Sequence, residues 1–217
     1  MAKIQERKLQ FQKKCDVKEF FVKENPLIGI HGIKGAFTEQ ALYRLTQEEL
    51  EIKESDYSTK ELVHSENVLK SVTEGDIDLG IFAFANSRSG GYLASINAMG
   101  KYNYRLVALF GMPINMCLIV HPDTDSKDLV EFRGHPVAMT MCRDNLREKY
   151  SHIPMNPDTD EMDTALSVEL LMKGELPKNV GVFASERAAQ IYGAKVLENG
   201  IHDDPNNTTF FALVTKS

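Results

Sequence analysis

Polar residues suited to hydrogen bonding gather in one short segment after an apolar run. Asn86, Ser87 and Ser89 follow the apolar run 79–84 and precede Gly90-Gly91. Such a run, bounded by turn residues, predicts a buried strand. Amide and hydroxyl groups at the carboxyl end of a strand lie where open α/β sheets bind ligands. A plain turn requires the same residue types, so the segment leaves a ligand site and a simple turn open.

His135 and Pro136 mark the start of a predicted helix, because proline is favoured in the first helical turn. The apolar stripe of this helix consists of Val137, Met141, Cys142 and Leu146. A helix N-terminus offers unpaired backbone N–H groups and a positive dipole end to anions such as carboxylates. His135 could itself donate to a carboxylate or only cap the turn, and both interpretations stay open.

A glycine-bearing segment, residues 32–38, predicts a second strand-loop-helix start. Its glycines, Gly35 among them, let the backbone approach a ligand closely. Ala36 and Phe37 lead into the helix, and Thr38 offers a hydroxyl either to a ligand or to the helix cap.

Further hydroxyl groups occur near the end of the chain and before a later helix. Thr208 and Thr209 precede Phe210 in a predicted closing strand, where threonine hydroxyls could simply be solvated. Thr164 follows Asp163, and an aspartate at this point is typical of a helix start.

The sequence does not support metal, nicotinamide or covalent chemistry. No His, Cys and Asp cluster has metal-ligand spacing, no glycine pattern has a dinucleotide signature, and no serine sits in a nucleophile elbow. We therefore expect no metal and no cofactor. Cys15, Cys117 and Cys142 are odd in number and far apart, which favours a reduced, cytoplasmic compartment.

The composition is that of a globular protein, with 217 residues of which 42% are hydrophobic and 26% charged. A net charge of -6 argues against a nucleic-acid partner, which would require a basic face. Small anions can still bind in local pockets. Because no long uncharged apolar run occurs, we expect neither a signal peptide nor a membrane partner.

Beyond Pro26, the apolar spacing predicts strands and helices in turn. The predicted strands are 27–30, 51–57, 79–84 and 180–184, and the predicted helices include 37–47 and 60–74. This alternation predicts a mostly parallel sheet with helices on both faces. The segment 104–115 carries two apolar runs split by Gly111-Met112-Pro113, which suits a crossover between two lobes.

Residues 1–25 predict a separate amphipathic N-terminal extension, because charged and apolar residues alternate until Asn25-Pro26 breaks any helix. We expect this extension to pack on its own domain or on a dimer mate. A membrane-surface helix is the alternative, for which the apolar spacing is not regular enough.

Five segments in order over residues 27–215 resemble the catalytic domain of prephenate dehydratases. They are GIKGAFTEQAL (32–42), EGDIDLGIFAFANSRSGG (74–91), GHPVAMTMC (134–142), EMDTALSVELL (161–171) and a closing segment from Tyr192 to Val214 that contains NNTTFFALV. An ordered set of motifs is far more specific than any one of them. The resemblance covers the catalytic domain only, since the sequence stops at Ser217 without room for the family's phenylalanine-binding regulatory domain.

The resemblance implies an α/β, two-lobed, periplasmic-binding-protein-like architecture with a ligand cleft between the lobes. We expect a dehydratase-like domain over residues 26–217, with lobe one at about 26–106, lobe two at about 107–205 and a closing strand at 208–215. The implied ligand is prephenate, a small dicarboxylate, the implied product is phenylpyruvate, and the implied assembly is a homodimer.

The resemblance also implies roles for individual residues. Thr208 stands at the position of the threonine that the family uses in its chemistry. The implied substrate-binding residues are Gly35, Ala36, Phe37, Thr38, Asn86, Ser87, Ser89, Gly90, His135, Pro136, Thr164, Thr209 and Phe210.

The chain departs from the family pattern at several of these positions. The family carries glutamate at the positions of Ala85 and Leu109, histidine at Met116, serine at Gly134 and arginine at Thr209. These changes remove two carboxylates, an imidazole, a hydroxyl and a guanidinium group.

Three functions fit this pattern. The first is a prephenate dehydratase-type lyase that uses Thr208. The second is a non-aromatising prephenate decarboxylase, which the absence of arginine at Thr209 favours and the retention of Thr208 opposes. The third is a non-catalytic small-carboxylate binding protein on the same fold. Arg88, inside the polar turn, could supply the cation lost at Thr209 or could be solvated.

Overall fold

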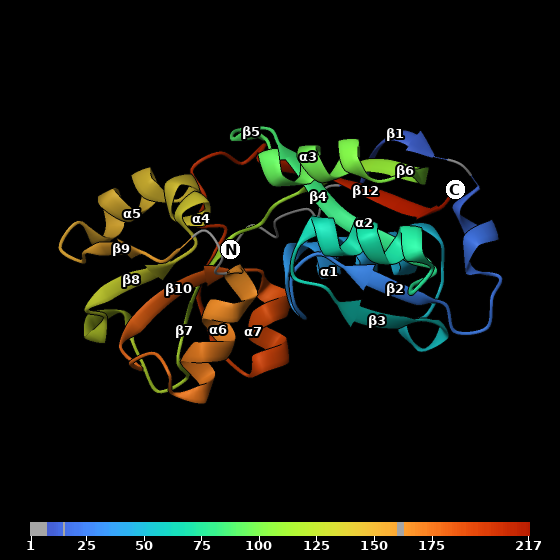
Figure 1. The fold of residues 1–217 in the computed structure, drawn as a ribbon. Helices are drawn as coiled ribbons and strands as arrows, with labels where there is room; N and C mark the ends of the chain where they lie inside the picture. Colours follow the sequence, from blue (N-terminus) through green and yellow to red (C-terminus); the bar gives the residue numbers. More distant parts are fainter. Residues whose placement is uncertain (1–7, 15, 160–162) are drawn as a thin grey trace. The chain divides into compact units, whose positions relative to one another are not determined.

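The computed structural model describes residues 8–14, 16–159 and 163–217 (Figure 1). This part of the chain divides into two compact units. The first contains the described residues up to Gly32 together with Ala41–Ile114 and Thr208–Ser217, and the second contains Ile33–Gln40 and Asn115–Asn207. The expected two-lobed α/β architecture is confirmed.

The boundary between the two units differs from the expected one. Instead of falling after residue 106, it falls after Ile114. The reason is that β6 (Tyr104–Pro113) belongs to the first sheet along its whole length, where it pairs with β12 (Thr208–Lys216) from Thr208↔Pro113 onward.

The first unit is built on a sheet with strand order β1-β6-β12-β4-β2-β3, to which β5 adds beside β4. The other strands of this sheet are β1 (Gln10–Lys14), β2 (Leu27–Ile30), β3 (Ser58–Glu61), β4 (Leu79–Asn86) and β5 (Gly90–Gly91). The strand predicted at 27–30 is confirmed. The strands β4, β2 and β3 are parallel, whereas β12 runs antiparallel to both β4 and β6. The prediction of a mostly parallel sheet is wrong for this unit, because the end of the chain returns to fill its centre.

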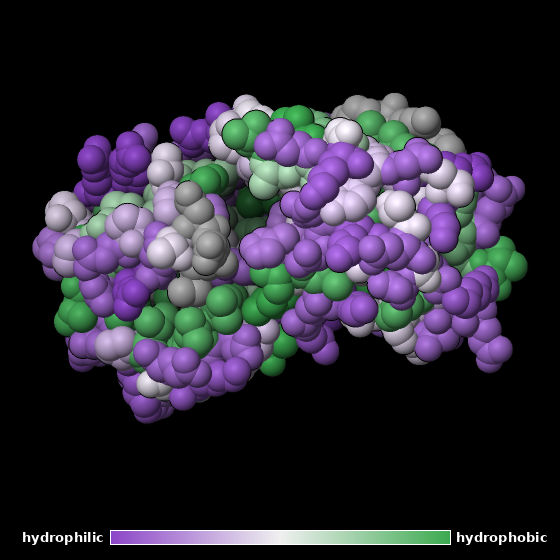
Figure 2. Space-filling view, in the orientation of Figure 1, coloured by the Kyte–Doolittle hydropathy of each residue, from purple (hydrophilic) through white to green (hydrophobic). Residues whose placement is uncertain are grey.

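Helices α2 and α3 pack on this sheet through an apolar cluster. The helices and turns of the unit are η1 (Val17–Phe21), the π-helical turn η2 (Leu45–Glu49), η3 (Glu54–Asp56), α2 (Ser65–Glu74) and α3 (Leu93–Lys101). Helix α1 (Phe37–Arg44) belongs to the second unit up to Gln40 and to the first unit from Ala41. Val68, Leu69 and Val72 of α2 are buried in one cluster with Phe82 of β4 and Val214 of β12. Figure 2 shows hydrophilic residues over the outward side of α2, as expected for an amphipathic helix.

Two predicted elements of the first unit are wrong in their bounds. The segment predicted as a strand at 51–57 holds the short helical turn η3, and the strand begins only at Ser58. The helix predicted from Lys60 begins at Ser65, because the chain first makes a tight turn at Val63. There φ is +58, and the N–H of His64 donates to the carbonyl of Leu62 at 2.6 Å. A β-branched residue seldom adopts this conformation, so the helical spacing misled the prediction.

The second unit has its own sheet, with order β11-β7-β10-β8-β9. Its strands are β7 (Cys117–Val120), β8 (Glu131–Gly134), β9 (Met155–Pro157), β10 (Val180–Ala184) and β11 (Lys195–Asn199). Its helices are η4 (Ser126–Asp128), α4 (Pro136–Met141), α5 (Arg143–Tyr150), α6 (Thr164–Lys173) and α7 (Glu186–Tyr192). Gly174 and Gly193 end α6 and α7 in the left-handed conformation, which glycine adopts without steric cost.

The N-terminal extension packs on the first unit. Strand β1 pairs antiparallel with β6, from Gln10↔Gly111 to Lys14↔Ala108. The prediction that the extension packs on its own domain is confirmed for these residues. Residues 1–7 and Cys15 lie outside the described residues. Among the described residues, no helix is both long and apolar enough to cross a membrane.

Gly80 of β4 lies where α2 approaches the sheet most closely. A Cβ atom at Gly80 would lie 2.6 Å from Val68 Cγ1 and 2.9 Å from Val72 Cγ2. Because valine side chains have few rotamers, we expect Gly80→Ala to lower the free energy of unfolding by about 1–3 kcal/mol. Gly100→Ala is the matched control, since nothing lies within 4 Å of its Cβ position in α3. That substitution should stabilise by about 0.5–1 kcal/mol. Urea titrations measure both, and equal midpoints would contradict the predicted contact.

Candidate functional site

The polar turn after β4 is a three-residue hairpin loop built around Asn86. The Asn86 Oδ1 atom accepts from the backbone N–H groups of Arg88 at 2.9 Å and Ser89 at 3.3 Å. Gly90 pairs with Asn86 across the hairpin at a φ of +76, the left-handed conformation that closes three-residue loops. The segment is therefore a turn, whether or not it also binds a ligand.

Asn86 also connects the turn to β12. Its side-chain amide donates from Nδ2 to Thr209 Oγ1 at 3.0 Å, and the two residues are paired in the antiparallel register of β4 and β12. The Tyr92 hydroxyl forms hydrogen bonds with Thr209 and Ser89, and burial raises its pKa. Because Oδ1 already accepts from backbone N–H groups, the orientation of the Asn86 amide is fixed.

Ser87 forms hydrogen bonds with both the N–H and the carbonyl group of Thr208. The Ser87 N–H donates to the Thr208 carbonyl at 2.8 Å, and the Thr208 N–H donates to Ser87 Oγ at 3.0 Å. Thr208 and Thr209 are only 8% and 6% exposed, so the alternative of two solvated hydroxyls is wrong. The start of β12 is thus fixed to the end of β4 by backbone and side-chain hydrogen bonds.

Gly111 of β6 sets the space around the Thr208 side chain. A Cβ atom at Gly111 would lie 2.9 Å from Thr208 Cγ2 and 3.2 Å from Phe210 Cε1. The Phe210 ring also faces Phe84, with 6.5 Å between ring centroids. The absence of a side chain at Gly111 therefore lets the Thr208 methyl group pack against β6.

His31 is a candidate site residue that the sequence analysis did not identify. It directly follows β2, whose neighbour β4 carries Asn86 at its own carboxyl end. Burial lowers the pKa of the His31 imidazole from 6.5 to about 4, and repulsion from His64 adds to the shift. The His31 Nδ1 atom is buried without a hydrogen-bond partner among the described residues. A single histidine in a glycine-bearing loop gives no signal in the sequence that separates it from a surface histidine.

In the second unit, His135 caps α4. Its Nδ1 atom accepts from the backbone N–H of Val137 at 3.1 Å, which confirms the capping interpretation. The neutral ring then carries its proton on Nε2. Pro136 begins the helix as predicted, but the helix ends at Met141 and a new one, α5, starts at Arg143. The single predicted helix is therefore wrong, because Cys142 leaves the helical conformation at a ψ of 5.

Gly134, where the family has serine, has a φ of +146. L-residues with side chains rarely adopt this conformation, so glycine suits the backbone here. A serine at position 134 would be strained in this backbone conformation. The change from serine to glycine therefore suits the local backbone as well as removing a hydroxyl group.

Gly35 serves a packing role in the second unit. Its φ is +87, and a Cβ atom would lie 3.0 Å from Ala188 Cα of α7. Its carbonyl accepts from the hydroxyl of Ser185 at 2.7 Å, and the same hydroxyl accepts from the Ala188 N–H at 3.0 Å to cap α7. Ala36 is buried in the adjoining apolar cluster. These contacts account for a glycine at this point without a ligand.

Phe37 is the first residue of α1 and Thr38 the second, so Thr38 lies past the N-cap position. Thr38 is buried, at 5% exposure, and the simple capping interpretation is not supported. Asp163 caps α6 through Oδ1, which accepts from the Ala165 N–H at 2.8 Å, and Thr164 is the first helical residue. The helix-start interpretation of Asp163 is confirmed, while Glu161 in the preceding motif lies outside the described residues.

The remaining departures lie in apolar or structural surroundings. Leu109 packs against the apolar cluster of the first unit. Met116 is 3% exposed, and its N–H donates to His202 Nδ1 at 3.3 Å. Ala85 pairs with Gly91 and with Phe210 in the first sheet. Arg88 is exposed and, in the part of the chain that the structure describes, forms no ion pair.

The predicted site residues thus form two groups, one on each unit. The group on the first unit is Asn86, Ser87, Ser89, Gly90, Thr208, Thr209 and Phe210. The group on the second unit is Gly35, Ala36, Phe37, Thr38, His135, Pro136 and Thr164. Side-chain hydrogen bonds connect members of the first group, from Asn86 to Thr209 and between Ser87 and Thr208. Among the described residues, no group of His, Cys, Asp or Glu could hold a metal ion.

The fold and this site define a mixed α/β domain of two units, with a polar group at the carboxyl end of a strand in the first. The family model for prephenate dehydratase matches residues 28–217. The chain therefore belongs to the prephenate dehydratase family, as the resemblance predicted.

The chain is also similar to curated plant proteins. Arogenate dehydratase 2 of Petunia hybrida is 26% identical over 192 residues, covering 87% of this chain and 44% of that protein. Arogenate dehydratase/prephenate dehydratase 1, chloroplastic, of Arabidopsis thaliana is 25% identical over 190 residues, covering 87% and 45%. The chain spans less than half the length of these relatives.

Solved structures agree on the fold. Prephenate dehydratase from Arthrobacter aurescens, in complex with L-Phe, matches with a TM-score of 0.76 and 24% identity, covering 88% of this chain and 60% of that one. Prephenate dehydratase from Staphylococcus aureus matches with a TM-score of 0.69 and 17% identity, covering 88% and 66%. At these identities the likeness concerns the fold alone.

Thr209→Val tests the hydrogen bond between β4 and β12. The substitution keeps the shape of the side chain but leaves the Asn86 amide and the Tyr92 hydroxyl without this partner in a buried place. We expect the free energy of unfolding to fall by about 1–3 kcal/mol in urea titrations. Thr59→Val on the exposed strand β3 is the matched control, with an expected change within about 0.5 kcal/mol. If Thr209→Val and Thr59→Val changed the free energy of unfolding equally, the hydrogen bond between Asn86 and Thr209 would add no stability.

The lowered pKa of the His31 imidazole leads us to expect that stability depends on pH. Since its pKa is lowered to about 4 in the folded protein, the unfolded chain binds a proton below pH 6.5 that the folded protein does not. Stability should therefore fall as the pH drops from 6.5 toward 4. In urea titrations at pH 7 and pH 5, His31→Gln should show a smaller fall than the wild type. His152→Gln, at an exposed histidine, is the control. A fall in His31→Gln equal to that of the wild type would contradict the burial of a neutral His31.

Proposed function

We propose that this domain is a prephenate dehydratase-type lyase, which converts prephenate to phenylpyruvate with loss of water and carbon dioxide. The observation that supports the proposal best is the hydrogen-bonded group of Asn86, Ser87, Thr208 and Thr209, which joins the end of β4 to the start of β12. All of these residues except the exposed Ser87 are buried. It unites residues that the family pattern places in the chemistry but that lie far apart in the sequence.

The reaction requires little more from the protein than correct orientation of the substrate. Expulsion of the ring hydroxyl and of carbon dioxide together is driven by the aromaticity of the product. The protein must hold the dianion and offer one hydrogen-bond donor to the departing hydroxyl. A threonine hydroxyl is a weak acid, so Thr208 would orient and hydrogen-bond the leaving group and would not deliver a full proton. The proton that turns the departing hydroxyl into water would come from solvent.

Ser87 supports this role of Thr208 by preorganisation. The two hydrogen bonds between Ser87 and the Thr208 backbone fix the residue before any ligand arrives. A donor that is already in place does not need to reorganise during the reaction, and this is the main source of electrostatic catalysis. The other predicted residues, on both units, remain our proposal for substrate binding.

The names of the relatives suggest a second substrate. Arogenate is prephenate with an amino group in place of the side-chain ketone, and its dehydration gives phenylalanine. The curated relatives from Petunia hybrida and Arabidopsis thaliana carry arogenate dehydratase in their names. The same group around Thr208 could serve either substrate, because the leaving hydroxyl and carboxylate are identical in both.

Two further functions keep specific support. Thr209 in place of the family's arginine favours a non-aromatising prephenate decarboxylase. The joint departures at Ala85, Leu109, Met116, Gly134 and Thr209 favour a non-catalytic small-carboxylate binding protein. For the binding protein, Leu109 packs against the apolar cluster of the first unit and Met116 is 3% exposed, so neither position offers a polar side chain to a substrate.

Mixing the purified protein with prephenate or arogenate at neutral pH separates these functions. Formation of phenylpyruvate, seen in its ultraviolet spectrum, or of phenylalanine supports the lyase and identifies its substrate. A non-aromatic keto acid supports the decarboxylase. Saturable binding without product supports the binding protein, and neither binding nor product contradicts all three.

Thr208→Val tests the proposed role of the hydroxyl. The change removes one hydroxyl and keeps the shape, so turnover of prephenate should fall at least about tenfold. Circular dichroism and urea titration should show a folded protein. Thr59→Val, the same substitution on an exposed strand, should keep the wild-type rate. Wild-type turnover in Thr208→Val would mean that Thr208 is only a strand residue.

A homodimer and a cytoplasmic location remain predictions of the family resemblance and of the cysteine content. The name of the Arabidopsis thaliana relative places that protein in the chloroplast. Light scattering after size-exclusion chromatography measures the assembly directly, and a mass near the 24.4 kDa of one chain would contradict the dimer.

A further inference from the structure

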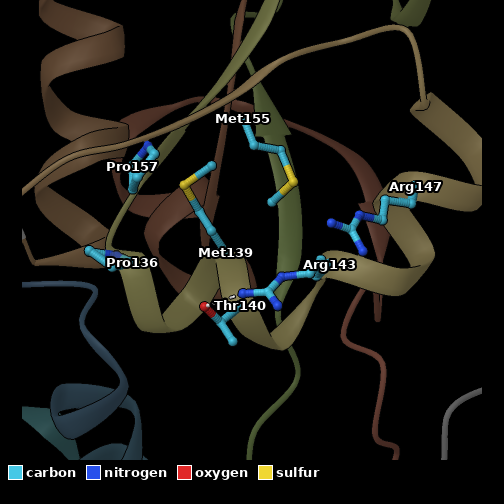
Figure 3. Close-up of a pocket in the computed structure, with 7 residues that line it drawn as sticks. All are labelled: Pro136, Met139, Thr140, Arg143, Arg147, Met155 and Pro157. Atoms are coloured by element: carbon cyan, nitrogen blue, oxygen red, sulfur yellow. Dashed lines mark hydrogen bonds between the residues drawn. The ribbon is translucent and has the colours of Figure 1, made fainter.

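The second unit contains a cavity of about 350 Å³ between α4, α5 and β9 (Figure 3). Its apolar wall consists of Pro136 and Met139 from α4 and of Met155 and Pro157 from β9. The volume lies in the range of small-molecule sites, which are mostly apolar with a few polar groups. Methionine side chains adapt their shape to a ligand, because they are unbranched and polarizable.

The polar side of this cavity is basic. It is formed by Thr140 of α4 and by Arg143 and Arg147 of α5. Arg143 Nη2 donates to Thr140 Oγ1 at 3.4 Å, which orients its guanidinium group. Figure 3 shows both guanidinium groups and both thioethers around the same space.

Both arginines of this cavity wall are exposed. Arg143 and Arg147 are one helical turn apart, a spacing at which like charges destabilise a helix. Neither forms an ion pair within the described part of the chain, although Lys149 on the same helix pairs with Glu198 and Arg133 of β8 pairs with Asp158. In a chain of net charge -6, two adjacent uncompensated arginines beside an apolar wall indicate a place for an anion.

We propose that this cavity binds a small organic monocarboxylate with an apolar body. A guanidinium group matches the geometry of a carboxylate through two parallel hydrogen bonds, and arginine does this better than lysine. The carboxylate lies between Arg143 and Arg147, and the apolar body packs on Met139 and Met155.

The cavity lies in the second unit, whereas the hydrogen-bonded group around Thr208 lies in the first. Pro136 is the one residue lining the cavity that also belongs to the set proposed for substrate binding. Met139 lines the cavity, whereas Met141 accepts from Asn207 Nδ2 through its sulfur at 3.3 Å. Residues two apart in an α-helix point about 200° apart, so these side chains lie on opposite faces of α4. The two methionines therefore report on different faces of one helix.

Methionine-methyl NMR tests the proposal on the intact protein. The chain has nine methionines, which ¹³C-methyl labelling resolves and Met→Leu variants assign. Titration with 3-phenylpropionate should shift the methyl signals of Met139 and Met155, with a Kd on the order of 1 mM for a ligand of this size. The uncharged 3-phenylpropanamide should bind at least about tenfold more weakly. Shifts confined to Met112 or Met141, or no shifts at all, would overturn the proposal.

Variants of the arginines complete the test. Arg143→Gln and Arg147→Gln should each weaken 3-phenylpropionate binding about tenfold or more, because each loses a charge-assisted hydrogen bond. Lys127→Gln is the control, since it removes one positive charge from an exposed place in the same unit. Equal weakening in the control would show general charge attraction and overturn the site. Turnover of prephenate plays no part in this readout, so failure of either proposal leaves the other intact.

Discussion

The insertion of β12 between β4 and β6 is the constraint on which the candidate site depends. β12 is antiparallel to both neighbours, and its first residues meet the turn that follows β4. The apolar residues of β12 contribute to the core beneath α2, which holds the strand in register. Because a shift of one residue would turn every side chain to the other face, this register decides where Thr208 and Thr209 point.

Hydrogen-bond saturation then gives the site its rigidity. Asn86 uses its carbonyl oxygen to hold its own turn and its amide nitrogen to hold Thr209, so each half of the side chain has a separate task. Ser87 uses its N–H and its hydroxyl on the same neighbour, Thr208. Buried polar groups are costly when unpaired, so the group favours one arrangement over any other. In the proposed lyase, a threonine held in this way would orient the leaving group although it is a weak acid.

Local features were predictable from the sequence, and pairings between distant segments were not. The strand at 27–30, the proline start of α4 and the Asp163 cap all depend on a few neighbouring residues. The bond between Asn86 and Thr209 joins residues 123 positions apart, and nothing in either segment specifies its partner. The mixed sheet was missed for the same reason, and the cavity at Arg143 requires three elements to meet. The family resemblance identified Thr208 and Thr209, but only the structure showed that both are buried.

A double-mutant cycle on Asn86 and Thr209, measured as the rate of phenylpyruvate formation from prephenate, tests the central claim most directly. Asn86→Ala, Thr209→Val and the double variant are compared with the wild type. If both residues act through their shared hydrogen bond to hold β12 in place, the double variant should be about as slow as the slower single variant. The coupling energy should then be about 0.5–3 kcal/mol. The account would be contradicted if the rate losses of the two single variants multiplied in the double variant. It would also be contradicted if the wild-type protein formed no phenylpyruvate.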